Sequence, residues 1–180
     1  MNSRRQSSVG HAVAISALAF CIGNAQVAHA AGCGDGLLEA AETCEACPAD
    51  CRPAVCKPSK EQRRVVIDLV TPGNLEVNAA HVRLAYRSDR VTLGAQGDGA
   101  EVKKRVSSPQ KLLALYTNNL GYAVGLVAVR GQRFDDGELA EITFDSCTGP
   151  KLTADDLSCF VESCSTAAGG SDCTCSARIL

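Results

Sequence analysis

The sequence of 180 residues has no tryptophan, one methionine, three tyrosines and four phenylalanines. So few aromatic side chains leave little material for a sugar-binding strip, which is built from exposed rings. No apolar run after the first thirty residues approaches the roughly 18 residues that a membrane-spanning helix requires. The formal net charge of −2 excludes a polycation that binds nucleic acids or membrane surfaces in general.

Patterns that carry common enzyme chemistry are missing as well. The chain has no G-x-S-x-G elbow, no H-E-x-x-H motif and no phosphate-binding loop. Beyond residue 30 it has a single histidine, His81, so no histidine pair exists for a zinc enzyme. Asp135 and Asp136 form a carboxylate pair, but Gly137 follows directly, and this combination is typical of a hairpin turn. We therefore expect a protein that is not an enzyme.

The first thirty residues predict export. Two arginines lie in a polar start without acids, residues 12–22 are apolar, and Ala28-His29-Ala30 offers small residues around a cleavage point. This order is that of a secretory signal peptide, here with cleavage after Ala30. A twin-arginine signal or lipidation at Cys21 fits less well, because the flanking residues differ from those signals. We expect a secreted protein, either extracellular, periplasmic or at the cell surface.

Eleven cysteines are too many for a reducing compartment unless they bind metal, so we expect disulfides. Removal of residues 1–30 takes Cys21 away and leaves ten. They form two groups of five: Cys33, Cys44, Cys47, Cys51 and Cys56, then Cys147, Cys159, Cys164, Cys173 and Cys175. Because five is odd, full oxidation requires at least one disulfide between the two groups. The remaining pairings stay open.

Residues 31–57 form the predicted disulfide-rich module. Its large apolar side chains are chiefly Leu37 and Leu38, too few for folding without covalent constraint. The segments C-G-D-G, E-T-C and C-P-A-D-C within 33–51 resemble a short repeat, CGDG…ETCxxCPxDC, of secreted proteins from myxobacteria and related bacteria. That repeat usually has another cysteine at the position of Leu38, and Cys56 is the candidate that replaces it.

Acidic residues of this module are candidate calcium ligands, because calcium prefers carboxylate oxygens. The candidates are Asp35, Glu39, Glu42 and Asp50. Their spacing does not match an EF-hand loop, and solvated carboxylates on a disulfide knot are the alternative. Calcium is the one cofactor that the sequence suggests. A redox-active or zinc-binding Cys44-x-x-Cys47 is a weaker alternative, because this pair does not open a helix after a strand.

The remainder, residues 58–180, has the period-two pattern of β-strands. Alternating or apolar runs cover 65–70, 81–87, 112–116, 122–129, 140–144 and 173–180, with Gly, Asn and Asp turns between them. No long segment has a helical stripe, and 94–110 is expected to be a polar loop or a weak edge strand. The pattern predicts an all-β fold, an antiparallel jelly-roll-like β-sandwich that follows the small disulfide-rich N-terminal module.

Two segments of this region resemble the cohesin domain, a jelly-roll sandwich related to certain cellulose-binding modules. Residues 82–91, V-R-L-A-Y-R-S-D-R-V, are similar to the family's strand ending in Y-D-P-x-x-L, and 134–144 to its G-x-[LI]-A-x-[IL]-x-F strand. The family's D-P is Arg87-Ser88 here, and its recognition N-x-D aligns with Ala79-Ala80-His81. The resemblance spans about residues 63–180. It implies a non-catalytic module that docks a partner protein, as cohesins dock a calcium-loaded dockerin.

The outward positions of 81–87 are the candidate contacts for such a partner. The alternation places Tyr86 in the core and His81, Arg83 and Ala85 on the outer face, and Tyr122 adds a ring beside a turn. We therefore expect binding through His81, Arg83, Ala85 and Tyr122. Two alternatives remain: a polysaccharide-binding module on the same sandwich, and a disulfide-stabilised structural protein of the surface or matrix.

Overall fold

The computed structural model describes residues 33–34, 36–38, 42–51, 55–71, 77–110, 114–134, 136–166 and 169–180, with the backbone alone for 126–134. The predicted signal peptide and the candidate calcium ligands Asp35 and Glu39 lie outside the described residues. Within the described ranges, no helix combines the length and the hydrophobicity that crossing a bilayer requires.

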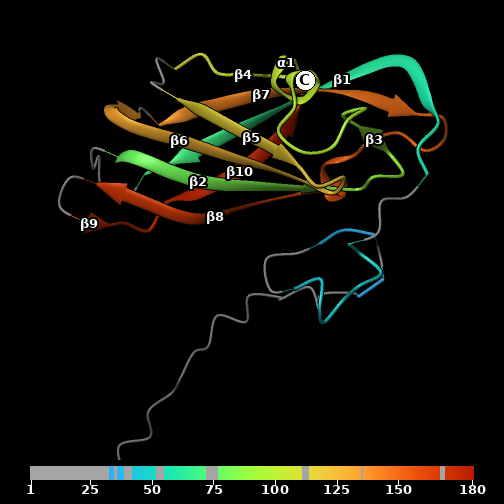
Figure 1. Cartoon of the computed structure of the whole chain (residues 1–180), viewed down its shortest axis with the longest axis horizontal. Coiled ribbons are helices and arrows are strands. Elements are labelled where there is room, and N and C mark those ends of the chain that lie inside the picture. Colours follow the sequence, from blue (N-terminus) through green and yellow to red (C-terminus); the bar gives the residue numbers. More distant parts are fainter. Residues whose placement is uncertain are drawn as a thin grey trace, which may run out of the picture.

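Two antiparallel β-sheets pack face to face, and the cysteine-rich module lies beside them (Figure 1). Sheet A has the strand order β10–β1–β7–β3, with β4 also paired to β7, and sheet B has the order β5–β6–β2–β8–β9. The strands are β1 (Pro58–Val70), β2 (Val77–Tyr86), β3 (Val91–Thr92), β4 (Val106–Ser107), β5 (Leu115–Asn119), β6 (Ala123–Phe134), β7 (Gly137–Cys147), β8 (Leu157–Thr166), β9 (Gly169–Gly170) and β10 (Thr174–Ile179). The predicted all-β class and two-sheet architecture are confirmed.

Alternation along the strands decides which side chains fill the space between the sheets. The core includes Val65, Ile67, Leu69, Val82, Leu84 and Tyr86. The Tyr86 ring meets Phe144 edge-on at a centroid distance of 4.9 Å, and its hydroxyl donates to Asn119 Oδ1 at 2.7 Å. Burial raises the pKa of the Tyr86 phenol, so the hydroxyl stays protonated and remains a donor. Tyr86 is therefore a core residue, as predicted.

Two elements differ from the expectations drawn from the sequence. The segment 94–110 contains the short strand β4, which fits the expected weak edge strand, but also an unexpected helix, α1 (Ala100–Lys104), because the buried Val102 and Val106 attach it to the core. Strand β8 is absent from our prediction because its sequence lacks a clear apolar alternation. The disulfides Cys159–Cys175 and Cys164–Cys173 join β8 to the C-terminal segment and supply constraint where large apolar side chains are few.

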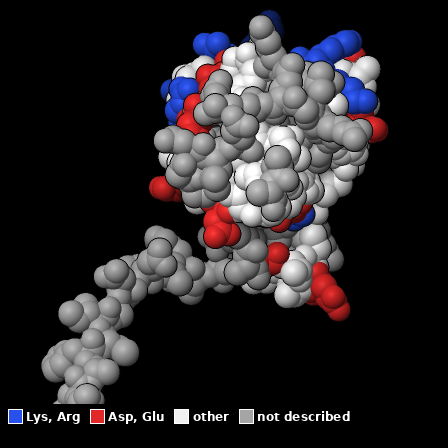
Figure 2. Space-filling model, turned by 90° about the vertical axis from the view of Figure 1, so that its left-hand side faces the viewer, with Lys and Arg blue, Asp and Glu red and all other residues white. Residues whose placement is uncertain are grey.

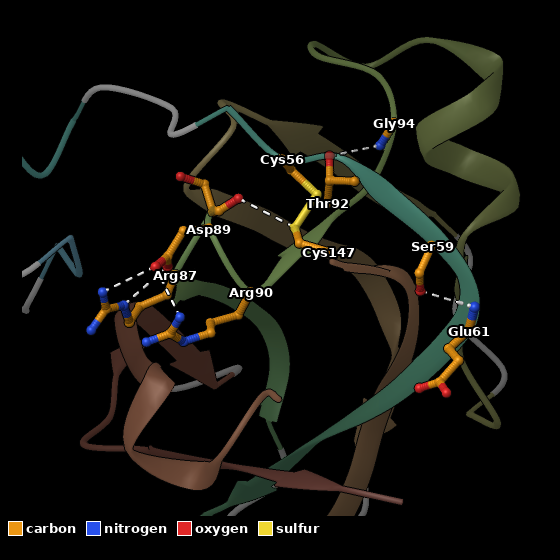
Figure 3. The surroundings of a disulfide bond; sticks show 10 residues. Cys56, Ser59, Glu61, Arg87, Asp89, Arg90, Thr92, Gly94 and Cys147 are labelled. Carbon is orange, nitrogen blue, oxygen red and sulfur yellow. Dashed lines mark hydrogen bonds and ion pairs between the residues drawn. A yellow bond between two sulfur atoms is a disulfide. The ribbon is translucent and has the colours of Figure 1, made fainter. Parts of the chain in front are cut away.

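The disulfide Cys56–Cys147 joins the two cysteine groups, which confirms the argument from parity (Figure 3). Cys33–Cys47 and Cys44–Cys51 close within the module. The expectation that Cys56 completes the module is wrong, because Cys56 instead anchors the start of the sandwich to the end of β7. Cys56–Cys147 spans a sequence separation of 91 residues, so on loop-entropy grounds it contributes about 4–5 kcal/mol.

Candidate functional site

The outer face of sheet B presents three rows of outward residues that cross neighbouring strands. From β5 to β8 the first row holds Tyr116, His81 and Ser163, and the second holds Asn118, Gly125, Arg83 and Phe160; the third, from β6 to β8, holds Ala123, Ala85 and Ser158. The predicted contacts His81, Arg83 and Ala85 therefore share one face and lie in successive rows. Their surroundings differ from row to row.

Glu162 joins the first two rows through a β-bulge. The β2–β8 register shifts between His81 and Val82, which leaves Glu162 as an extra residue on β8. Such a bulge re-aims a side chain, here outward between His81 and Arg83. Glu162 Oε2 lies 2.6 Å from His81 Nδ1, and Glu162 Oε1 pairs with the Arg83 guanidinium. Sequence patterning missed Glu162, because a bulge interrupts the period of two.

The electrostatics of this cluster favour a neutral imidazole. Burial, and after it the positive charge of Arg83, lowers the pKa of His81 below its ordinary value. In the neutral form, the short contact to Glu162 places the ring proton on Nδ1 and leaves Nε2 as an acceptor. Arg83 lies over the Phe160 ring, with 5.3 Å between the guanidinium carbon and the ring centroid. The cluster thus combines an immobilised cation, a paired carboxylate and an unprotonated nitrogen.

Gly125 leaves the middle position of the second row without a side chain, and we call this position the notch. Among the described atoms, a Cβ at Gly125 would meet His81 Nε2 at 3.7 Å, which is an ordinary contact. Gly125 is not among the glycines with positive φ, so its backbone conformation suits other residues too. A glycine in a strand interior weakens the strand and often marks a place where another group approaches closely. The notch lies beside Arg83 and within reach of His81.

The third row is covered by the chain's own cysteine-rich module. Leu37 and Leu38 form one buried cluster with Ala85, whose exposed fraction is 0%. Tyr122 and Phe160 pack against this cluster. Two of the four predicted contacts, Ala85 and Tyr122, therefore touch the module, whereas His81 and Arg83 keep exposed surface.

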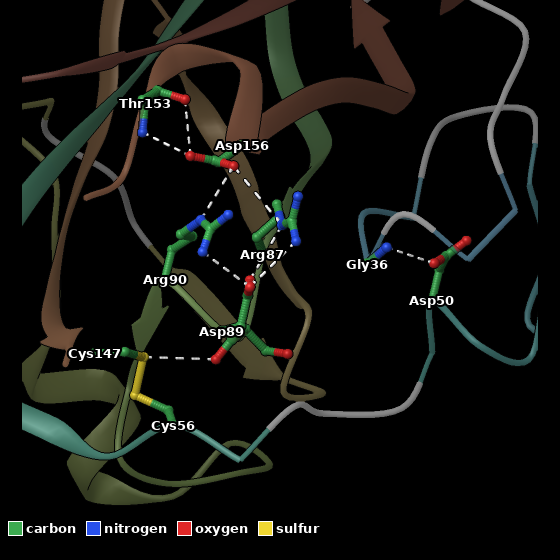
Figure 4. Close-up of polar contacts among 10 residues, drawn as sticks. Gly36, Asp50, Cys56, Arg87, Asp89, Arg90, Cys147, Thr153 and Asp156 are labelled. Carbon is green, nitrogen blue, oxygen red and sulfur yellow. Dashed lines mark hydrogen bonds and ion pairs between the residues drawn. A yellow bond between two sulfur atoms is a disulfide. The ribbon is translucent and has the colours of Figure 1, made fainter. Parts of the chain in front are cut away.

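Arg87 lies at the junction between the module and the sandwich (Figure 4). Its guanidinium atoms are 3.8 Å from the position that a Cβ of Gly36 would take. Its Nε lies 3.1 Å from Asp89 Oδ1 and 3.8 Å from Asp156 Oδ1, and Arg90 pairs with the same two carboxylates. Where the cohesin-like motif would place an aspartate, this chain therefore has a cation beside its module.

Asp50 holds the C-G-D-G turn of the module. Its Oδ2 accepts the Gly34 N–H at 2.8 Å and its Oδ1 accepts the Gly36 N–H at 2.7 Å. Both glycines have positive φ, 99° and 86°, which favours glycine at these positions. The buried Asp50 carboxylate also lies beside the sulfurs of Cys33–Cys47, but a disulfide offers no thiolate ligand. Calcium binding by Asp50 and the half-buried Glu42 stays a prediction.

The outer face of sheet A differs from that of sheet B. It carries long charged side chains in pairs: Arg64 with Glu141 at 3.6 Å, and Arg178 with Asp68 at 2.8 Å and with Glu138 at 3.4 Å. Such a ladder is typical of a solvated sheet surface. Figure 2 shows basic side chains at the top of the sandwich and acidic ones on the module below.

Comparison with known proteins yields one similar structure. No protein family matches the sequence, and no curated protein matches it. A solved cohesin module from a family 33 glycoside hydrolase of Clostridium perfringens is similar at 14% identity and a TM-score of 0.46, with 70% of this chain and 92% of that chain covered. The functional argument therefore depends on the face of sheet B itself.

Proposed function

We propose that this chain is a secreted, non-catalytic module that docks a partner protein on the outer face of sheet B. The observation that carries the proposal is the Gly125 notch beside the cluster of His81, Glu162 and Arg83. A solvated face needs neither a glycine in an inner strand nor a bulge that aims a carboxylate between two basic residues. Both features cost strand regularity, and both fit a surface that receives another molecule.

The chemistry of the cluster suits a protein partner. Arginine and aromatic residues are enriched among the few residues that dominate binding energy, and here Arg83 lies over Phe160. Because Glu162 and Phe160 already fix the guanidinium, docking immobilises little additional side-chain freedom. His81 Nε2 offers an acceptor to a donor that enters the notch. The resemblance of residues 82–91 and 134–144 to cohesin motifs supports the same role.

A polysaccharide is the second candidate ligand, and one observation favours it. Tyr116 is 43% exposed and lies in the same row as His81 on the outer face. A sugar ring could stack on this phenol while its hydroxyls reach Asn118 in the next row. A single exposed ring provides less stacking area than a strip of aromatic residues, so protein docking remains the leading proposal.

Capture of secreted proteins tests the proposal. The oxidised protein is immobilised and exposed to the secreted fraction of its source organism, once with calcium and once with a chelator. We expect one partner to be retained by the wild type, lost with Arg83→Ala, and kept with Arg178→Ala. Arg178 is the matched control, because its two ion pairs lie on the outer face of sheet A. A partner lost equally with both variants, or with neither, contradicts docking at the polar cluster of His81, Glu162 and Arg83.

The second candidate has its own arm in the experiment. The same proteins are mixed with insoluble polysaccharides and sedimented. If the wild type co-sediments with a polysaccharide, Tyr116→Ala does not, and no secreted protein is retained, glycan binding would replace protein docking as the proposed function. Calcium-dependent retention of a protein would favour a partner that itself requires the ion, as the cohesin-like motifs imply.

A further inference from the structure

The cysteine-rich module reaches the outer face of sheet B through two leucines, and this contact defines a second binding surface. We propose that the apolar end of the face, made by Ala85, Tyr122 and Phe160, is a docking site for two adjacent aliphatic side chains on a rigid turn. Leu37-Leu38 fill it as a tethered, exchangeable ligand, and a partner protein with the same feature takes their place. The inference rests on the proposed function in assigning partner docking to this face.

The shape of the site fits this kind of ligand. Ala85 and Ala123 are neighbours across β2 and β6, and their small side chains leave a shallow floor on the outer face. Tyr122 and Phe160 pack at its border. Leu38 is 2% exposed on this floor, so the fit excludes water. Complete burial of a leucine contributes roughly 1.5–3 kcal/mol, enough to seat the module yet compatible with exchange.

The disulfide pattern allows the module to leave as a unit. Cys33–Cys47 and Cys44–Cys51 both close inside residues 33–51, and Cys56–Cys147 fixes the chain on the sandwich side of the connection. Departure of the module from its site therefore breaks no covalent bond. The module keeps its own cross-links when it leaves, so the leucine pair stays on a constrained turn.

The tether makes the module a strong competitor for this site. Five residue steps separate Cys51 from Cys56, a reach of at most about 17 Å. Such a short connection gives the module an effective concentration of the order of millimolar at its own site. A free ligand of equal intrinsic affinity is therefore largely excluded from the wild-type protein. Removal of the two leucines from the module should make the site available.

The test uses the full chain and a defined probe. The probe is a fluorescent synthetic peptide of residues 31–52, oxidised to the pairs Cys33–Cys47 and Cys44–Cys51. We expect the double variant Leu37→Ser/Leu38→Ser to bind this peptide at least tenfold more tightly than the wild type, as measured by anisotropy. Val55→Ser is the matched control, because Val55 is 91% exposed and its loss should leave the site occupied. A peptide with both leucines replaced by serine should not bind.

Three outcomes overturn the inference. Equal peptide affinity for the wild type and the double variant would show that the module does not compete for the site. If the double variant does not bind the peptide although its sandwich melts at the same temperature as in the wild type, no such site exists. Ala85→Arg, added to the double variant, should abolish binding; persistent binding would place the peptide elsewhere.

The two proposals can fail separately. Arg83→Ala tests the polar cluster through retention of a secreted partner, whereas the peptide assay reads the apolar end alone. If the double variant binds the peptide but Arg83→Ala does not reduce partner retention, the polar docking site is contradicted and the apolar site stands. The reverse pattern would contradict the apolar site alone.

Discussion

Glu162 Oε2 lies 2.6 Å from His81 Nδ1, although the strand register pairs His81 with Ser163. The bulge that brings the two side chains together also carries the second carboxylate oxygen to Arg83. One irregularity in β8 therefore organises both basic residues of β2 that face outward. The arrangement couples the protonation of His81 to the charge beside it.

The pKa of His81 provides the first prediction. Burial and Arg83 lower it from 6.5, so the unfolded chain binds more protons than the folded one near that pH. His81 therefore contributes stability above its unfolded pKa, and this contribution is lost as the pH falls from about 6.5 through the folded pKa. We expect the His81 ring resonances in NMR spectra to titrate below pH 6.5 and Arg83→Gln to move the midpoint upward. An unchanged midpoint in Arg83→Gln would contradict the assigned electrostatics.

The long-range disulfide provides the second prediction. Replacement of Cys56 and Cys147 by serine should lower the free energy of unfolding of the sandwich by about 2–5 kcal/mol in urea denaturation. Replacement of Cys33 and Cys47 is the control and should leave the sandwich transition nearly unchanged, since that pair closes within the module. Equal losses in both double variants would show that module and sandwich unfold as one unit.

The carboxylate of Asp50 provides the third prediction. Asp50→Ala leaves the Gly34 and Gly36 N–H groups without their acceptor and should cost about 1–3 kcal/mol of local stability. Hydrogen exchange should then accelerate at these two amides but not in β1 or β2. Asp50→Asn keeps one acceptor oxygen and should give an intermediate effect. Unchanged exchange in Asp50→Ala would contradict the structural role of this carboxylate.

Calcium is tested with the same pair of proteins. If the predicted calcium site exists, millimolar calcium raises the melting temperature of the wild type and has no effect on Asp50→Ala. The same shift in both proteins would exclude Asp50 as a ligand. No shift in the wild type would contradict the calcium prediction itself.

The sequence predicts the sandwich because its signals are local. Apolar alternation at Val65, Ile67 and Leu69 identifies core-facing strands, and the odd number of cysteines on each side predicts the link that Cys56–Cys147 provides. The outward direction of His81 and Arg83 follows from the same period of two. These inferences need no knowledge of which strands become neighbours.

The remaining features depend on tertiary contacts that no local pattern encodes. Strand β8 is poor in large apolar side chains, and its bulge at Glu162 shifts the alternation by one residue. The burial of Ala85 results from Leu37 and Leu38, which lie almost fifty positions earlier in the chain. One signal was available: Leu37 and Leu38 are the chief large apolar side chains of a module too small to bury them alone.

Gly125 supports the most direct test of the docking proposal. Gly125→Thr fills the notch. Because the backbone is compatible with other residues, a Cβ would meet His81 Nε2 at the ordinary distance of 3.7 Å and threonine favours strands, we expect the sandwich to be as stable or more stable. The measurement is retention of the secreted partner by Gly125→Thr and by the wild type, with their melting temperatures determined in parallel. We predict at least tenfold weaker retention without loss of stability. Retention equal to that of the wild type in a fully folded Gly125→Thr protein would contradict docking at the notch and the polar cluster on the outer face of sheet B.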